Sequence, residues 1–142
     1  MGRSRGGFST KLHALVDTKG RPLHVELTPG QQHESTVAEE VITQHAQGKA
    51  FIADTGYDSN AIRACVKRRG MKAVIHPSPS RRNKPRLDRK TYRKRYLVEV
   101  FFHNLKRFRC LATRFDKTAK HYLAFVHVAC SLIWVQEVIA QR

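Results

Sequence analysis

Hydrophobic and polar residues alternate with a period of two in the first part of the chain. Residues 9–17 show one such run, and residues 22–28 show another. This alternation is typical of β-strands with one buried face. The sequence "DTKGRP" between the runs has turn chemistry, and Gly20 within it can adopt a positive φ angle. The pattern therefore predicts a β-hairpin.

The spacing of hydrophobic residues becomes helical after this hairpin. Thr36 is followed three residues later by Glu39, which matches a capping box, so we expect a helix from Thr36 to about Gly48. Residues 50–54, "AFIAD", are mostly apolar and have the length of a buried strand. The pattern thus predicts a helix followed directly by a strand.

A second helix and a further strand are expected next. Either Asp58 or Ser59 can cap this helix, which should run through Arg69 and stop at Gly70. Residues 71–76 again have the composition of a buried strand. Strands that alternate with helices indicate an α/β layered domain, and a hairpin followed by strand–helix units indicates a mixed sheet.

Residues 77–95, which we call the basic segment, differ in character from the rest. The segment contains three prolines, and nine of the fifteen residues from Arg81 to Arg95 are Lys or Arg. We expect a charged, mobile loop. Such cation density is typical of contacts with nucleic-acid phosphates, and a solvated charged surface is the alternative interpretation. The predicted DNA-binding residues here are Arg81, Arg82, Lys84, Arg86, Arg89 and Lys90.

The net charge of the whole chain supports a polyanionic partner. The 142 residues include 27 Lys and Arg against 11 Asp and Glu, which gives a charge of +16 with neutral histidines. A charge this large opposes folding by self-repulsion, and binding to a polyanion is the usual reason to carry it. DNA is the first candidate, and an anionic membrane surface is the second.

The longest apolar run and the cysteines bear on where the protein works. The run Tyr122–Val135 is 14 residues long. A membrane-spanning helix needs about 20 apolar residues, so we expect a buried core helix and no membrane association. Cys65, Cys110 and Cys130 are far apart and odd in number, as expected of reduced thiols in a cytoplasmic protein.

Glu99 is an isolated acidic residue in a strongly basic stretch, within a helix that is predicted after the basic segment. At 100° per residue, Tyr92, Arg95, Glu99 and Lys106 fall within about 60° of arc, opposite an apolar face. One interpretation is a solvated face on which Glu99 pairs with Arg95 or His103 at i,i+4 spacing. The other is a carboxylate that holds a divalent metal among cations that bind phosphates.

A metal site needs more than one carboxylate, and Asp54 is the natural second one. It closes a predicted apolar strand, and the functional crevice of α/β sheets lies at the carboxyl ends of strands. Gly56 lets the chain turn away from this position. The alternative interpretation makes Asp54 an ordinary turn residue at a strand end.

These motifs together resemble a known family. The spacing of Tyr92, Arg95, Glu99 and Lys106 reproduces the Y-(2)-R-(3)-E-(6)-K signature of bacterial insertion-sequence transposases. "ADTGYDS" is similar to the strand-end segment that carries the second catalytic aspartate of that family. "GFSTKLHALVDTKGRPL", "TPGQQHES" and "LKRFRCLATRFDK" resemble flanking segments, so that the resemblance covers nearly the whole chain. It is strongest to the insertion-sequence-five group of DDE transposases, which have an RNase H-like fold.

The resemblance implies a metal-dependent reaction on DNA. Asp54 would be the second catalytic acid and Glu99 the third, and both would bind a pair of Mg²⁺ ions, with Mn²⁺ as an alternative. The reaction would nick DNA at the terminal inverted repeats of a transposon and then join the free end to target DNA. Tyr92, Arg95 and Lys106 would contact end DNA or position the scissile phosphate.

The chain also departs from the family pattern. The first catalytic aspartate of the family lies on a strand upstream of the hairpin, and Asp17 in the hairpin turn is a poor substitute. We therefore expect residues 1–142 to be the C-terminal portion of an RNase H-like catalytic domain, N-terminally incomplete. The missing portion could come from an upstream frame. Alone, the chain should be inactive; a homodimer and a nucleoid-associated location are further expectations.

Two alternatives remain open at this level. The first is a non-enzymatic basic DNA-binding module. The second is a truncated transposase that occupies transposon ends without cutting and so acts as an inhibitor. If Asp54 and Glu99 share one metal site, the enzymatic interpretation is favoured over both alternatives.

Overall fold

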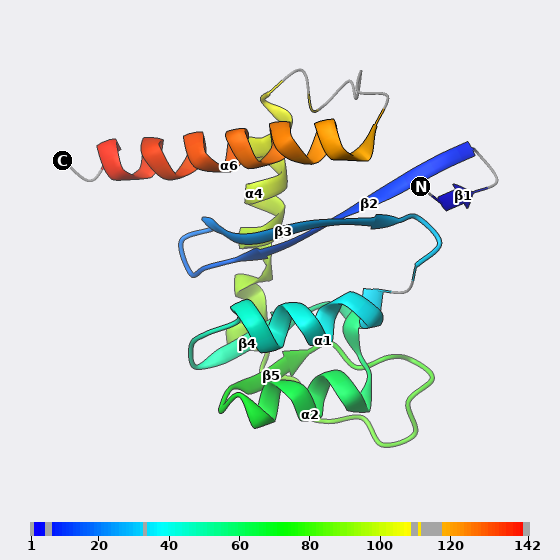
Figure 1. Ribbon diagram of the computed structural model, residues 1–142. Helices are drawn as coiled ribbons and strands as arrows, with labels where there is room; N and C mark the ends of the chain where they lie inside the picture. The colour runs from blue at the N-terminus through cyan, green and yellow to red at the C-terminus, as the bar shows by residue number, and fades with distance from the viewer. Residues whose placement is uncertain (1, 5–6, 33, 109–110, 112–117, 141–142) are drawn as a thin grey trace. The chain divides into compact units, whose positions relative to one another are not determined.

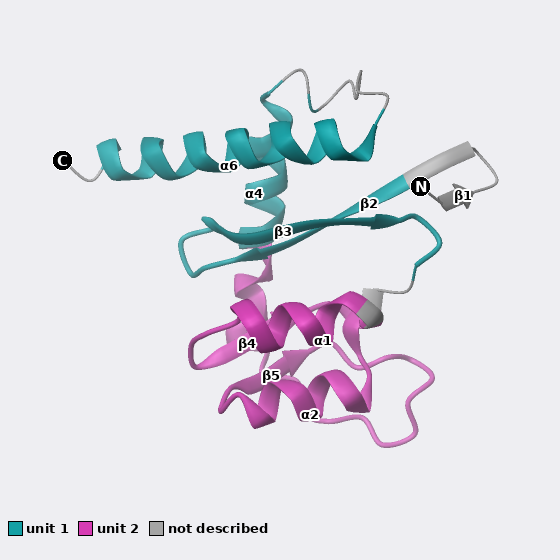
Figure 2. Ribbon diagram, viewed as in Figure 1, with its two compact units in different colours: residues 1–32, 97–142 teal, residues 33–96 magenta. Residues whose placement is uncertain are grey.

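The structure is a computed structural model that describes residues 2–4, 7–32, 34–108, 111 and 118–140. The chain divides into two compact units (Figure 2). Unit 1 comprises residues 1–32 and 97–142, and unit 2 comprises residues 33–96. Figure 1 labels the helices and strands of both units.

Unit 1 is built on the β-hairpin that the alternating pattern predicts. Strands β2 (Gly7–Val16) and β3 (Pro22–Pro29) pair antiparallel, with Leu12 opposite Leu27. A short strand, β1 (Gly2–Ser4), which the sequence did not predict, pairs with the start of β2. The prediction of a hairpin is confirmed.

The hairpin turn is held together by Asp17. Its carboxylate accepts hydrogen bonds from the backbone N–H groups of Lys19 and Arg21 at 2.8 and 3.0 Å, and it forms an ion pair with the Arg21 guanidinium at 2.6 Å. Burial alone would raise the pKa of Asp17, but the bonds from Arg21 and Lys19 outweigh it and lower the pKa. Gly20 adopts a φ of 78°, as the turn requires. Asp17 is thus a turn residue.

Two helices pack on this hairpin. Helix α4 spans Tyr96–Lys106 and helix α6 spans Ala119–Ala140. Trp134 on α6 donates an indole hydrogen bond of 2.8 Å to the Pro22 carbonyl, and the Arg21 guanidinium lies 4.2 Å from the centre of the indole ring. The apolar side chains between hairpin and helices form the core of unit 1: Val25, Phe101, Leu105, Leu111, Val126, Ala129, Cys130 and Ile133.

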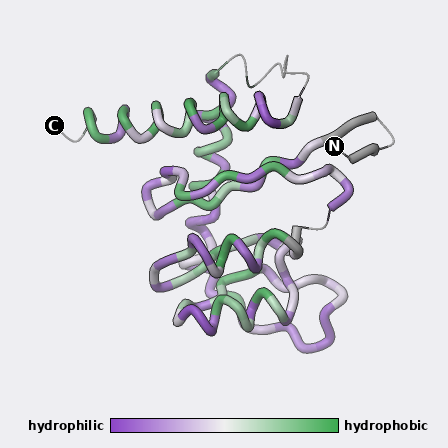
Figure 3. The backbone as a smooth tube through the Cα atoms, in the orientation of Figure 1, coloured by the Kyte–Doolittle hydropathy of each residue, from purple (hydrophilic) through white to green (hydrophobic). Residues whose placement is uncertain are grey.

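Helix α6 is longer and more exposed than the predicted buried core helix. Of its 22 residues, four contribute one buried stripe, and the most apolar 18-residue window is only 22% buried. Figure 3 shows hydrophobic residues along most of its length. By length and composition alone, α6 could cross a membrane. The buried stripe belongs to the core of unit 1, and α6 is part of that unit. The exposed apolar side chains are Phe125, Val128, Leu132, Val135, Val138 and Ile139.

Unit 2 is a strand–helix–strand layer. Strands β4 (Ala50–Ala53) and β5 (Lys72–Ile75) pair in parallel, and α2 (Asn60–Arg68) connects them, after the short 3₁₀ turn η1 (Thr55–Tyr57). Helix α1 (Glu34–His45) packs beside α2 (Figure 1). The side chains buried most completely here are Ile42, Ile62, Cys65, Val66, Val74 and Ile75.

Local signals account for the ends of α2 but not for the start of α1. Ser59 caps α2 by accepting a hydrogen bond of 3.0 Å from the Ile62 N–H, and Gly70 follows the helix with a φ of 72°. Between the two predicted caps, Ser59 is therefore the one used. Helix α1 begins at Glu34, so Thr36 lies within the helix and cannot cap it.

The described strands form an antiparallel sheet in unit 1 and a parallel pair in unit 2, so the single mixed sheet stays a prediction. One prediction about a larger element was wrong. The basic segment is not a loop throughout, because α3 (Arg89–Tyr92) and the 3₁₀ turn η2 (Arg93–Arg95) lead directly into α4. Asp88 caps the start of α3, because its carboxylate accepts a hydrogen bond of 3.1 Å from the Thr91 N–H. This cap within the basic segment was not predicted from the sequence.

Candidate functional site

Asp54 lies at the carboxyl end of β4, as the sequence predicts, and its side chain is exposed. It caps η1 because its Oδ1 accepts a hydrogen bond of 3.0 Å from the Gly56 N–H. The other carboxylate oxygen has no bond in the described part of the chain. Asp54 therefore combines the role of a turn residue with an oxygen that remains available for a ligand.

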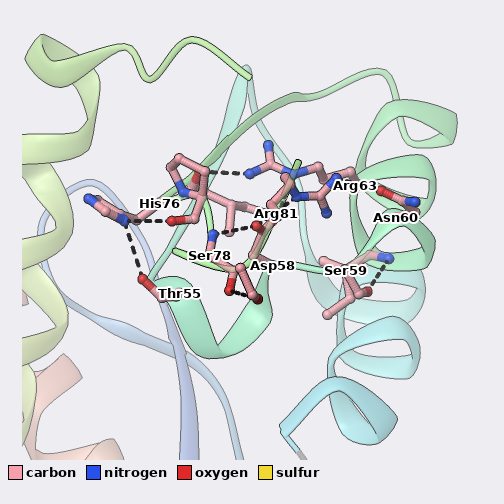
Figure 4. Close-up of polar contacts among 12 residues, drawn as sticks. Thr55, Asp58, Ser59, Asn60, Arg63, His76, Ser78 and Arg81 are labelled. Atoms are coloured by element: carbon pink, nitrogen blue, oxygen red, sulfur yellow. Dashed lines mark hydrogen bonds and ion pairs between the residues drawn. The ribbon is translucent and has the colours of Figure 1, made fainter. Parts of the chain in front are cut away.

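His76 stands beside this turn, at the end of the neighbouring strand. Its backbone N–H donates a bond of 3.2 Å to the Ala53 carbonyl, which continues the parallel pairing of β4 and β5. Its Nδ1 lies 3.2 Å from the Thr55 hydroxyl (Figure 4). Sequence reasoning missed His76, although the rule that selected Asp54 at one strand end also applies to the residue that follows β5.

The first residue of the four-residue signature lies against His76. The ring centroids of His76 and Tyr92 are 5.6 Å apart, at an interplanar angle of 52°. Because His76 also contacts Thr55, the strand-end segment and the start of the signature meet within unit 2. Two motifs that lie almost 40 residues apart in the chain, at Asp54 and Tyr92, are thus brought to one side of unit 2.

An open cavity of about 1100 Å³ adjoins this pair of rings. Its walls carry one carboxylate, that of Asp88, which forms an ion pair with Lys72 at 2.7 Å. This bond from Lys72 and the bonds from Thr91 lower the pKa of Asp88. The cavity is therefore cationic overall, and it suits an anionic ligand. Its lining residues are Lys72, His76, Pro77, Pro85, Arg86, Leu87, Asp88, Arg89, Tyr92 and Arg93.

The cations predicted to bind DNA fall into two groups. Arg82, Lys84, Arg86, Arg89 and Lys90 have exposed side chains and make no ion pair in the described part of the chain. Arg81 differs, because its guanidinium binds Asp58 at 2.9 Å and Asn60 at 2.7 Å (Figure 4). Arg81 is thus engaged within the protein itself.

Glu99, the predicted third catalytic acid, belongs to unit 1. Glu99 and Lys106 are exposed on α4 in unit 1, whereas Tyr92 and Arg95 lie in unit 2. The 3₁₀ turn η2 advances by about 120° per residue, so the uniform 100° spacing assumed from the sequence does not hold between Tyr92 and Glu99. Within the described ranges, no three His, Cys, Asp or Glu side chains gather to form a metal site.

Comparison with known proteins identifies the family. The model of the transposase DDE domain family matches residues 2–134. A Brucella ovis protein named "Putative transposase for insertion sequence element IS6501" is 37% identical over 131 residues, which covers 91% of this chain and 100% of that protein. No solved structure matches the chain significantly.

The chain therefore belongs to the DDE transposases, and within them to those of insertion sequences. Its general function is DNA transposition, and DNA is the substrate on which such proteins act. The exposed cations of unit 2 are consistent with that substrate.

Proposed function

We propose that this chain supplies Asp54 and Glu99 as metal-binding carboxylates for cleavage and joining of DNA strands at transposon ends. The observation that carries the proposal is the position of Asp54. It is exposed at a strand end, on the same side of unit 2 as His76 and the signature residue Tyr92. A residue that served only the turn would not require a position beside His76 and Tyr92.

The donor chemistry of both acids suits the proposed metal. Carboxylate oxygens are the ligands that Mg²⁺ and Mn²⁺ prefer, and Asp54 has one oxygen free for this purpose. A bound pair of ions would activate the attacking hydroxyl and stabilise the leaving oxygen. Tyr92, Arg95 and Lys106 would hold the DNA phosphates near the acids. Among the described residues no three His, Cys, Asp or Glu side chains gather, so the proposal requires both acids.

An RNase H-like domain with a further strand is the proposed setting for these acids. Among the described strands, β4 pairs only with β5, so one edge of this apolar strand can accept another strand. A transposase portion encoded in an upstream frame could supply that strand together with the first aspartate. On this proposal residues 1–142 form the C-terminal portion of the catalytic domain and lack activity by themselves.

The proposed partners are the terminal inverted repeats of the element and target DNA. Arg82, Lys84, Arg86, Arg89 and Lys90 would contact phosphates, since all five are exposed cations of one segment. Phosphate contacts give a DNA affinity that decreases as the salt concentration rises and that depends little on the DNA sequence. We further propose a homodimer and a cytoplasmic, nucleoid-associated location, as expected of a protein that acts on chromosomal DNA.

Iron-mediated cleavage of the protein backbone tests the shared metal site without requiring activity. Fe²⁺ would replace Mg²⁺ on the full chain, and ascorbate with peroxide would then cut the backbone near the bound ion. Cuts near both Asp54 and Glu99 are expected, and Mg²⁺ should suppress them. Asp54→Asn should abolish both cuts, whereas Glu40→Gln, which removes an exposed carboxylate of α1, should change neither. Cuts at unrelated positions, or none, would contradict the proposal.

A DNA-binding module or inhibitor without catalysis is the second candidate. The exposed cations of the basic segment favour it, because they suffice for binding and require no metal. The candidates differ in a strand-transfer assay in which the upstream portion is supplied. Asp54→Asn should eliminate joined products and leave DNA affinity within about twofold if the chain is catalytic. Strand transfer by the pure 142-residue chain would contradict our proposal that it is inactive alone.

A further inference from the structure

Asp58 is a buried acid for which the proposed reaction has no use. Its side chain is 0% exposed. Its Oδ1 accepts a bond of 2.7 Å from Arg63, and its Oδ2 accepts the backbone N–H of Ser78 at 2.6 Å and the Arg81 guanidinium at 2.9 Å (Figure 4). One carboxylate therefore binds two arginines and the backbone at the start of the basic segment.

The two arginines extend this network to both neighbouring elements. The terminal nitrogen of Arg63 donates a bond of 2.8 Å to the Ile75 carbonyl at the end of β5. A terminal nitrogen of Arg81 donates a bond of 2.7 Å to the side chain of Asn60, the first residue of α2. Asp58 thus joins the start of α2 and the end of β5 to the turn at residues 78–81.

A second attachment lies at the other end of the exposed stretch. Asp88 binds Lys72 of β5 at 2.7 Å and caps α3. Between the two attachments, residues 82–87 carry three exposed cations: Arg82, Lys84 and Arg86. A stretch of six residues fastened at both ends has fewer accessible conformations than a free loop of equal composition.

We propose that Asp58 is a positioning residue that presents Arg82, Lys84 and Arg86 to DNA as a preorganised set. The inference rests on the proposed DNA-binding role of the basic segment and assigns to Asp58 the fixing of its backbone. Asp58 touches no DNA. It acts through Ser78 and Arg81. Because it fixes the segment before DNA binds, the segment loses less conformational entropy on binding than a free segment would.

A purely electrostatic role for the segment makes the opposite prediction. Asp58→Asn removes a buried negative charge next to the basic segment and releases Arg63 and Arg81 from their ionised partner. If only the number of cations mattered, DNA affinity would rise and its salt dependence would steepen. If position matters, affinity falls although the net charge becomes more positive. The sign of the change separates the two accounts.

The experiment measures affinity of the full chain for a labelled DNA duplex by fluorescence anisotropy at fixed salt. We expect Asp58→Asn to bind about threefold to tenfold more weakly than the wild type. The matched control is Glu40→Gln, which removes an exposed carboxylate of the same unit far from this network in sequence, and it should bind equally well or slightly more tightly. Unchanged or tighter binding by Asp58→Asn would overturn the inference while leaving DNA binding intact. A wild type that does not bind DNA would overturn both proposals.

A second pair of variants decides the question if Asp58→Asn fails to fold. Arg81→Ala and Arg82→Ala each remove one cation, but only Arg81 contacts Asp58. Limited trypsin digestion reports the freedom of the segment through cleavage after Arg86, since Pro85 protects the bond after Lys84. Arg81→Ala should accelerate this cleavage about tenfold and weaken DNA binding more than Arg82→Ala does. Equal cleavage rates and equal affinities for the two variants would overturn the inference.

Discussion

The imidazole of His76 lies against the phenol ring of Tyr92, with 5.6 Å between the ring centroids. His76 directly follows β5 and lies beside the turn that holds Asp54, and Tyr92 is the last residue of α3. The contact therefore links the two motifs that resemble insertion-sequence transposases. It gives Tyr92 a structural role in unit 2 that is separable from the proposed role of its hydroxyl on DNA.

Substitutions at Tyr92 should separate these roles. Tyr92→Phe keeps the ring contact with His76, so the free energy of unfolding should change by less than about 0.5 kcal/mol. Tyr92→Ala removes the ring and should cost about 1 kcal/mol. Urea unfolding measures both values. If the hydroxyl contacts DNA, Tyr92→Phe should weaken DNA binding at nearly unchanged stability, and equal stability losses in the two variants would contradict the packing role.

The free energy of unfolding should decrease at low pH because the carboxylate of Asp58 becomes protonated. Burial would raise its pKa, but the bonds from Ser78, Arg81 and Arg63 lower it from 3.8 to about 2. Because the folded pKa lies below the unfolded one, the stabilisation is complete above about pH 4 and disappears as the pH falls through 2. The shift corresponds to about 2 kcal/mol.

Denaturant unfolding between pH 5 and pH 2 measures this contribution. The wild type should lose about 2 kcal/mol more over the range than Asp58→Asn, which has no carboxyl group to protonate at this position. Parallel pH profiles for the two proteins would show that the carboxylate of Asp58 does not stabilise the fold.

Trp134 should report the docking of α6 on the hairpin. It is the only tryptophan of the chain, and its indole binds the Pro22 carbonyl and the Arg21 guanidinium. Trp134→Phe removes both interactions and should lower the free energy of unfolding of unit 1 by about 1–2 kcal/mol. Arg21→Gln should shift the Trp134 fluorescence maximum to the red by less than urea unfolding does, because the hydrogen bond from Trp134 to the Pro22 carbonyl remains in this variant. An unchanged midpoint for Trp134→Phe would contradict the docking role.

The core of unit 1 should depend strongly on Phe101. Its side chain is 0% exposed and packs among Val25, Val126 and Ala129. Phe101→Ala leaves a cavity and should cost about 3–5 kcal/mol. Phe102→Ala is the neighbouring comparison, since Phe102 is only partly buried and should cost less. Thermal unfolding followed by circular dichroism measures both, and equal losses would contradict the assigned core.

The salt dependence of DNA binding should identify the phosphate contacts. Each lost contact lowers the slope of log K against log salt by about 0.9. Arg86→Ala should show this change, because Arg86 is exposed and lines the cationic cavity. Lys67→Ala, an exposed cation in the last turn of α2, should leave the slope nearly unchanged. Identical slopes for both variants would mean that the cations act only through total charge.

Several local features of this protein were readable from its sequence because neighbouring residues cause them, although the capping box at Thr36 did not mark the start of α1. Gly20 and Gly70 occupy positive φ positions that few other residues adopt, and Ser59 satisfies an N–H three residues away. Alternation of apolar residues in the hairpin reflects the two faces of a strand. The four-residue signature likewise depends on residue types at short spacings, which is why the family was recognisable.

Tertiary structure alone decided the roles of the residues whose partners are distant in sequence. Arg81 counts as one more cation in the sequence, yet its partner Asp58 lies 23 residues away and is reached only because β5 returns beside β4. The position of His76 at the candidate site likewise depends on its contacts with Thr55 and Tyr92, which are distant in sequence. Local propensity acts over a few residues, whereas burial and ion pairing are set by which strands become neighbours, and that choice is made by the whole fold.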